Sequence, residues 1–201
     1  MQRKPYSAGA VKFSFWFQEF RKAVFMLADG ASLVEVKKLN QETNIFAASS
    51  PERAKLIMSN VAKRIEALDP SFVPLFVRSD VVGQKLLCLI ACMCTDTLFF
   101  DFVYDVIRVK LALGLNEYGD SDARKFWDDK QVQSDKVANL TEATRMRLLS
   151  TYKQYLYNAG ITEGNAGSRK IIVPIISADI VAWLREHDLQ PALAALTGGI
   201  I

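Results

Sequence analysis

The segment Leu140–Ile176 combines a helix, a turn and a β-strand in a short stretch of sequence. Thr141 suits an N-cap, because its hydroxyl can accept a hydrogen bond from a first-turn amide, and Glu142 then lies favourably against the helix dipole. Gly160 suits the position after the helix, because glycine adopts the left-handed conformation without a Cβ penalty. A helix is therefore predicted from about Glu142 to just before Gly160. Its apolar face, at helical spacing, consists of Leu148, Leu149, Tyr152, Tyr155 and Leu156.

A basic loop and a strand follow this predicted helix. Ile171–Ile176 is rich in β-branched residues and fits a strand, which Pro174 confines to a sheet edge or ends. Arg169 and Lys170 stand at its start, directly after the Gly164–Ser168 loop. Helix, basic loop and strand in this order are typical of half a winged helix-turn-helix, whose basic wing contacts phosphate. The alternative, a small helix and hairpin packed on the body of the protein, stays open.

Length and composition favour a soluble globular protein. The chain has 201 residues, of which 50% are hydrophobic and 23% charged, enough for one large domain or two small ones. The apolar run Leu86–Cys94 is shorter than the roughly 20 residues that a membrane span needs, and charged residues follow it. The N-terminus lacks the continuous apolar core of a secretory signal. We therefore expect no membrane anchor and a cytoplasmic protein.

The charge is unevenly distributed along the chain. Residues 1–64 carry 11 Lys and Arg against 5 Asp and Glu, whereas residues 65–139 carry 8 against 12. Residues 140–201 carry 6 against 5, and the whole chain has a net charge of +3. A basic N-terminal third beside an acidic middle suggests one face for a polyanion and another for a protein partner. Solvated surface charge is the simpler explanation.

Three helices are predicted in the basic N-terminal part. The first covers 13–28 with a dense aromatic stripe, and Ser32 and Glu35 then form a capping box that starts a second helix over 33–40. The Ser50-Pro51 pair starts a third helix. Three such helices suit a helix-turn-helix unit with the third as the reading helix, although the connection 41–49 is longer than the usual turn.

The rest of the chain is predicted to be mostly helical. Two long apolar helices cover 81–94 and 96–113, and a short helix with Phe126 and Trp127 follows. Ser177 caps a last helix, and 190–201 forms a short helix or a frayed end. With Pro70 and Pro74 near a boundary, the expected division is a helix-turn-helix-like unit over 1–70, an apolar helical middle over 71–139 and a winged-helix-like unit over 140–201. The predicted fold class is a mostly α helical bundle with one short β hairpin or strand.

The sequence offers little for catalysis or metal binding. Cys88, Cys92 and Cys94 lie on one apolar helix far from the only histidine, His187, so buried free thiols explain them better than a zinc site. No phosphate-binding, dinucleotide-binding or zinc-protease motif is present. The three acids of the second apolar helix, Asp96, Asp101 and Asp105, are expected to cap, pair with Arg108 or face solvent. We therefore expect neither an enzyme nor a cofactor.

A set of features spread over roughly residues 6 to 185 forms one pattern: Ser7-Ala8-Gly9, Ser50 with Arg53, Arg64 with Ile65 and Leu68, Leu89–Cys92, Phe102 with Val103 and Val106, Phe126, Leu140–Thr144, Leu148 and Asn158–Ile161. This pattern resembles the BrxA family of the bacterial BREX phage-defence systems, long described as a domain of unknown function. The chain departs from the family pattern at Cys94 and Thr95, where an aromatic residue is more usual.

The resemblance implies a mostly α protein with winged-helix character that binds double-stranded DNA without catalysing a reaction. Other BREX proteins are further expected partners, and homo-oligomerisation stays open. The alternative function is a protein-interaction scaffold that does not bind DNA. The candidate DNA-contacting residues are Lys37, Lys38, Arg53, Lys55, Lys63, Arg64, Arg145, Arg147, Arg169 and Lys170.

Overall fold

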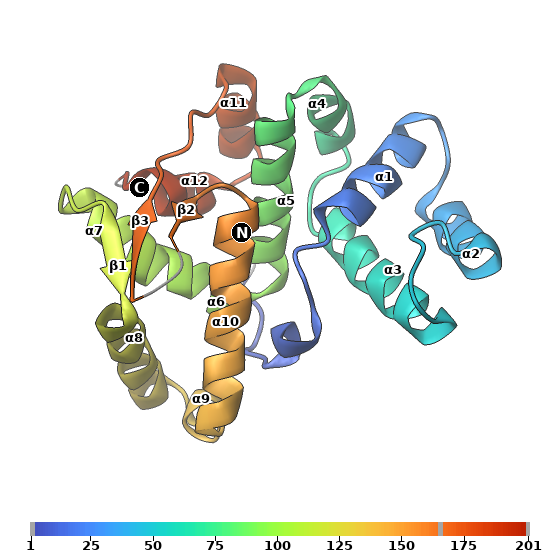
Figure 1. The fold of residues 1–201 in the computed structure, drawn as a ribbon. Coiled ribbons are helices and arrows are strands. Elements are labelled where there is room, and N and C mark those ends of the chain that lie inside the picture. Colours follow the sequence, from blue (N-terminus) through green and yellow to red (C-terminus); the bar gives the residue numbers. More distant parts are fainter. Residues whose placement is uncertain (1–2, 165–166, 200–201) are drawn as a thin grey trace.

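The computed structural model describes residues 3–164 and 167–199 and shows a mostly helical chain with one small antiparallel sheet (Figure 1). The fold class predicted from the sequence, mostly α with one short β region, is therefore confirmed. The elements in chain order are η1 (Gly9–Lys12), α1 (Phe17–Ala28), α2 (Leu33–Thr43), α3 (Pro51–Glu66), α4 (Phe72–Arg78), α5 (Val81–Thr95), α6 (Thr97–Phe102), the π-helical η2 (Val103–Arg108), α7 (Val109–Ala112), β1 (Glu117–Gly119), α8 (Asp120–Gln133), α9 (Asp135–Ala138), α10 (Glu142–Asn158), β2 (Thr162–Glu163), β3 (Ser168–Ile171), α11 (Ala178–Glu186) and α12 (Gln190–Thr197).

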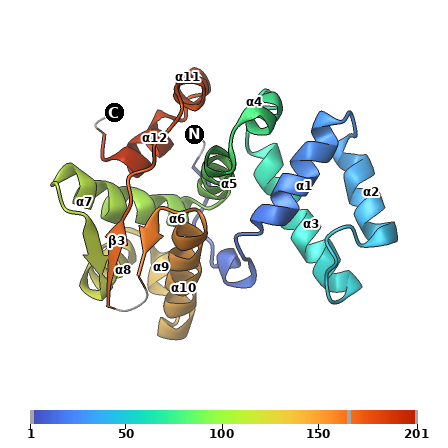
Figure 2. The ribbon, with the colours of Figure 1, turned by 45° about the horizontal axis from the view of Figure 1, so that its top comes forward.

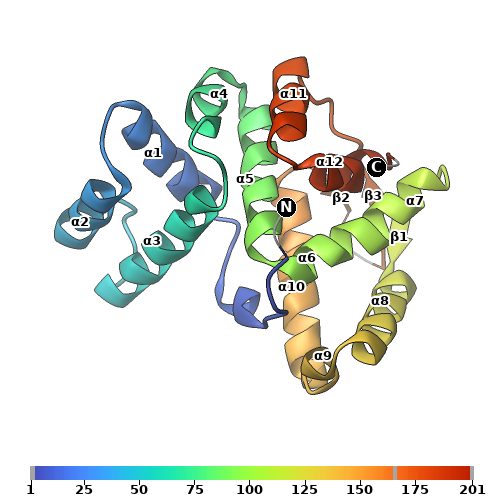
Figure 3. The ribbon, with the colours of Figure 1, turned by 180° about the vertical axis from the view of Figure 1, so that it is seen from behind.

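Helix α5 lies at the centre of the molecule, between the N-terminal helices and the sheet (Figures 1 and 2). Its apolar run Leu86–Cys94 is buried throughout, and the helix packs against α1, α3, α4, α6 and α10. From behind, α12 lies against the long helical stretch that contains η2 (Figure 3). In the described residues no single helix is long and apolar enough to cross a membrane; α5 and the helical run 97–112 pass that test only together, bent by 113°.

Helices α2, α3 and α10 begin at the capping residues that the sequence predicts, and α10 ends before the predicted glycine. The Ser32 and Glu35 capping box starts α2, and the Ser50 hydroxyl accepts a hydrogen bond from the Arg53 amide at the start of α3. The Thr141 hydroxyl caps α10 in the same way. Gly160 adopts a φ of 79°, as expected for a residue that ends a helix.

The first helix is shorter than its aromatic pattern predicts. It begins at Phe17 instead of Phe13, because the backbone carbonyls of Ser14 and Phe15 accept hydrogen bonds from the buried Arg64 side chain. Trp16 precedes the helix with a left-handed φ of 48°. These two carbonyls would belong to the first turn of a helix that began at Phe13, but here they accept hydrogen bonds from the Arg64 side chain instead.

The predicted strand is displaced. β3 covers Ser168–Ile171, and the apolar run beyond it contains no described strand up to α11. Pro174 supplies no amide for a ladder, which agrees with this early end. Two strands were not predicted from the sequence: β2 and β1 pair antiparallel with β3 on its two sides, in the order β1-β3-β2. The predicted loop includes 165 and 166, which lie outside the described residues.

Packing continues across both expected domain boundaries. Phe72 and Phe76 of α4 pack against Phe20 of α1, with ring centroids 6.2 and 5.6 Å away, so contacts cross the boundary at 70. β1 pairs with β3, so the sheet crosses the boundary at 139. The π-helical turn of η2 also interrupts the predicted helix 96–113. Side-chain packing and strand pairing therefore join the three expected parts of the chain.

Candidate nucleic-acid interface

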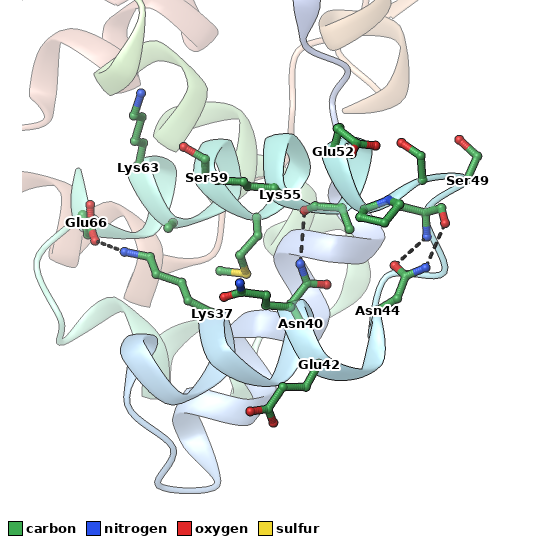
Figure 4. A pocket seen from close by; sticks show the side chains of 17 residues that line it. Lys37, Asn40, Glu42, Asn44, Ser49, Glu52, Lys55, Ser59, Lys63 and Glu66 are labelled. Carbon is green, nitrogen blue, oxygen red and sulfur yellow. Dashed lines mark hydrogen bonds and ion pairs between the residues drawn. The ribbon is translucent and has the colours of Figure 1, made fainter.

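A groove of about 930 Å³ runs between α2 and α3 on the basic N-terminal part (Figure 4). Three of the candidate cations, Lys37, Lys55 and Lys63, line it. Lys55, Ser59 and Lys63 follow one another at a spacing of four residues, so they form one exposed stripe along α3. The packing of α2 against α3 thus brings lysines of both helices to one groove.

Ion pairs within the groove leave two of these lysines unneutralised. Lys37 binds Glu66 across the groove at 3.0 Å, and both side chains are about half exposed. Lys55 and Lys63 form no ion pair with the described part of the chain. Since their ammonium groups are exposed, they are available to an anion.

The other candidates of the N-terminal part differ in their surroundings. Lys38 is exposed on α2 outside the groove lining and lies 3.9 Å from Glu42. The guanidinium of Arg53 lies over the Trp16 ring, 5.2 Å from its centroid. Arg53 therefore has a packing role at the start of α3 in addition to its charge.

Arg64 does not lie on a surface that DNA could reach. Its relative exposure is 1%, and its guanidinium donates hydrogen bonds to the carbonyls of Phe15 and Ser14 and to the Tyr155 hydroxyl. The expectation of a surface contact fails because the backbone of the N-terminal segment folds over α3 at this point. Arg64 instead holds α3, this segment and α10 together.

The candidates of α10 lie away from the groove. Arg145 donates hydrogen bonds to the Gln131 side chain at 2.9 Å and to the Leu140 carbonyl at 2.7 Å, so it stabilises the α8–α10 connection. Arg147 is exposed. Of these two, Arg147 presents its charge to solvent.

The residues of the predicted wing, Arg169 and Lys170, lie in β3, which pairs with β2. Lys170 is exposed and binds Glu163 across the two strands at 3.1 Å, with side chains 56% and 54% exposed. Arg169 is partly exposed and stands opposite Tyr118 of β1 in the ladder. The wing and the groove lie at opposite ends of the molecule, so the structure brings the candidate cations together in two places rather than one (Figure 1).

A buried ionic cluster around Asp101 was not predicted. Asp101, only 3% exposed, accepts hydrogen bonds from Arg3 at 2.8 Å, from the Tyr6 hydroxyl at 2.6 Å and from Lys130 at 3.0 Å. Lys130 also binds Asp105 at 2.9 Å. Burial acts to lower the pKa of Lys130, but its hydrogen bonds to Asp105 and Asp101 outweigh burial and raise that pKa above its usual value. These acids are structural partners, although Lys130 rather than Arg108 pairs with them.

The residues considered for metal or acid–base chemistry are dispersed. Cys88, Cys92 and Cys94 are buried and free. His187 is packed against Trp183, and its Nε2 lies 3.2 Å from the Ser71 hydroxyl. In the described residues no three His, Cys, Asp or Glu side chains are grouped to hold a metal ion. The candidate sites that remain are the lysine stripe on α3 and the wing.

Fold and surface together define a small α-helical protein with exposed lysines on a helix pair at one end and Arg169 and Lys170 on a hairpin strand at the other. The chain belongs to the BrxA family, whose model matches residues 4–188. A BREX protein BrxA from Bacillus cereus (strain H3081.97) is 32% identical over 169 residues, which cover 84% of each chain. The crystal structure of an uncharacterized protein from Magnetospirillum magneticum has the same fold, with a TM-score of 0.75 and 16% identity over 98% of this chain and 100% of that one.

Proposed function

We propose that the protein is a non-catalytic accessory component of a BREX bacteriophage-defence system and binds double-stranded DNA, mainly through phosphate contacts. Family membership and the name of the Bacillus cereus relative support the BREX assignment. The single observation that supports DNA binding best is the stripe on α3, where Lys55 and Lys63 are exposed and unneutralised within the described chain. Cations of this kind bind a polyanion and release its counterions.

The hairpin of β2 and β3 offers a second phosphate contact. Lys170 is more than half exposed, and its ion pair with Glu163 is a surface pair of the kind that contributes little stability. A phosphate can therefore replace the carboxylate at small cost. The proposal includes a cytoplasmic location, which agrees with three cysteines that form no disulfide.

The decisive experiment is a salt titration of duplex binding. Fluorescence anisotropy of a labelled duplex of about 20 base pairs gives the dissociation constant between about 50 and 300 mM KCl, a range over which phosphate contacts weaken measurably. We expect the logarithm of affinity to fall linearly with the logarithm of salt, by about 0.9 per phosphate contact. Equal affinity for unrelated sequences is expected, because phosphate contacts carry no base information. The absence of duplex binding at the lowest salt concentration would contradict the proposal.

A further inference from the structure

The two basic residues of the wing start from opposite faces of the sheet, because successive residues of a strand alternate between its faces. Lys170 lies opposite Glu117 of β1 on one side and opposite Glu163 of β2 on the other, so two acids flank it. Arg169 instead lies opposite Tyr118, which is only 1% exposed. Since directly opposite residues share a face, Arg169 starts from the inner face of the sheet. The two wing cations therefore have different surroundings.

The inner face of the sheet is bordered by α8 and α10. β3 is the central strand, β1 contacts α8 and β2 contacts α10 (Figure 1). β1 ends at Gly119 and α8 begins at the next residue, Asp120, so Asp120 follows Tyr118, the partner of Arg169, by two positions. The ammonium of Lys153 in α10 lies 2.8 Å from the Asp120 carboxylate. Residues of β3, α8 and α10 thus converge on Asp120.

Three cations surround the Asp120 carboxylate. Arg124 follows Asp120 by four residues on the same side of α8. The hydrogen bond from Lys153, together with the positive charges of Lys153, Arg169 and Arg124, lowers the pKa of the Asp120 carboxyl. The next acid on this side of α8 is Asp128, and within the described chain neither it nor Arg124 forms an ion pair. Even with Asp128 included, three cations face two acids, so the local charge is positive.

These side chains lie at the surface, where a ligand can reach them. Arg124 is exposed, Arg169 is partly exposed, and the Asp120 side chain is 56% exposed. Tyr157 follows Lys153 by four residues on the same side of α10 and is itself 56% exposed. Guanidinium and ammonium groups beside a phenolic hydroxyl are donors of the kind that contact phosphate oxygens.

We propose that Arg124, Lys153 and Arg169 form a phosphate-binding site that holds the backbone of a bound duplex. This inference rests on the proposed function and deepens it, because it adds residues of α8 and α10 to the DNA-binding surface. Asp120 competes with the phosphate for the Lys153 ammonium. The carboxylate therefore limits the affinity of the site, and its ion pair with Lys153 opens when a phosphate binds.

The first test compares two charge reversals on α8 in the full chain. Arg124→Glu should weaken binding of a labelled duplex of about 20 base pairs by about fivefold or more at about 100 mM KCl, and should reduce the salt slope by about 0.9. Lys125→Glu is the matched control, because Lys125 is exposed and lies about 100° further round the same helix. It should change the affinity by less than about twofold. Fluorescence anisotropy measures both.

The second test predicts a gain of binding. Asp120→Asn removes the competing charge and releases Lys153, so it should tighten duplex binding by about two- to threefold. Asp129→Asn, an exposed position on the other side of α8, is the control and should change the affinity by less than about 1.5-fold. A purely structural role of Asp120 would predict equal or weaker binding. Circular dichroism and thermal unfolding check that each variant keeps its fold.

A third measurement separates the duplex backbone from free phosphate as the ligand. Inorganic phosphate at about 10 mM should displace the duplex no more than KCl of equal ionic strength does, because an isolated phosphate lacks the neighbouring contacts of a duplex. Displacement beyond that of KCl would show that free phosphate occupies the site and would overturn the proposal.

Equal effects of Arg124→Glu and Lys125→Glu would also overturn it, since total charge alone would then explain the binding. Unchanged or weaker binding by Asp120→Asn would do the same. If the wild-type chain binds the duplex but does not respond to Arg124→Glu or Asp120→Asn, only this inference fails. If the wild-type chain binds no duplex at the lowest salt concentration, the proposed function fails and this inference with it.

Discussion

The guanidinium of Arg64 in α3 donates a hydrogen bond of 3.1 Å to the hydroxyl of Tyr155 in α10, two residues that are 91 positions apart in the sequence. The same guanidinium holds the carbonyls of Ser14 and Phe15. One buried side chain therefore fixes the N-terminal helices to the body of the protein.

Arg64→Ala should lower the free energy of unfolding by about 3 kcal/mol, because it leaves the Tyr155 hydroxyl and two backbone carbonyls without their donor. Urea unfolding followed by circular dichroism measures this change. Lys63→Ala, one residue away but exposed, is the control and should stay within about 0.5 kcal/mol of wild type. Equal effects of the two substitutions would show that the Arg64 hydrogen bonds do not matter for stability.

Asp101→Asn should destabilise the protein by roughly 3–5 kcal/mol, because it removes the more deeply buried of the two carboxylates that compensate the buried Lys130 ammonium. Asp128→Asn on the exposed side of α8 gives the matched control, for which little change is expected. Thermal and urea unfolding of both variants measure the difference. A loss below about 1 kcal/mol for Asp101→Asn would mean that Asp105 alone suffices for Lys130.

Asp96 should make stability fall as the pH rises from about 4 to 6. Burial raises the pKa of Asp96 to about 6, although hydrogen bonds from the amides of Phe99 and Leu98 and from Tyr152 act to lower it. The folded state then binds the proton more tightly than the unfolded state, so the stabilising contribution of the protonated carboxyl is full below about pH 4 and is lost as the pH rises through about 6.

The Asp96→Asn variant keeps an acceptor for the two amides but does not titrate. Relative to wild type, its free energy of unfolding should therefore increase between about pH 4.5 and pH 7, by about 2 kcal/mol. Urea unfolding at the two pH values gives this difference. A difference that stays constant or changes in the opposite direction would contradict the raised pKa.

Lys55→Ala with Lys63→Ala should weaken duplex binding and reduce the salt slope by about two phosphate contacts, with little effect on melting temperature, since both side chains are exposed. Arg53→Ala should differ, because it also removes a guanidinium stacked on Trp16 and so lowers stability. Anisotropy and thermal unfolding separate the two effects. Unchanged affinity in the lysine variant would remove α3 from the DNA-binding surface.

Arg169→Glu with Lys170→Glu should reduce duplex affinity for all sequences about equally, because the reversed charge repels phosphate and carries no base information. Competition with unrelated duplexes of equal length measures this. Retention of full affinity would exclude the wing from DNA contact. Loss for one sequence alone would instead indicate that the wing reads bases.

Local features of the fold could be predicted from the sequence, because their determinants lie within a few residues. Ser32, Ser50 and Thr141 cap helices through amides three residues away. β1 could not be predicted, since its three residues pair with a strand some 50 positions later. Nothing in a short window distinguishes such a segment from a loop.

The candidate site was predicted in part. Sequence identifies the lysines of α2 and α3 but not the groove between the helices, which depends on their packing. The burial of Arg64 had a signal: it lies four residues before Leu68 and three after Val61, on the apolar side of its helix. Two of its partners are backbone carbonyls about 50 residues away, and no pattern of side chains indicates these.

The contact between Arg3 and Asp101 also sets an order of events during synthesis. These residues are 98 positions apart, so at roughly 5–20 residues per second the ribosome adds Asp101 about 5–20 s after Arg3. Tyr155, whose hydroxyl accepts a hydrogen bond from Arg64, is added later still. The N-terminal helices can therefore form early on the nascent chain, whereas their attachment to the rest of the protein must wait until most of it has been translated.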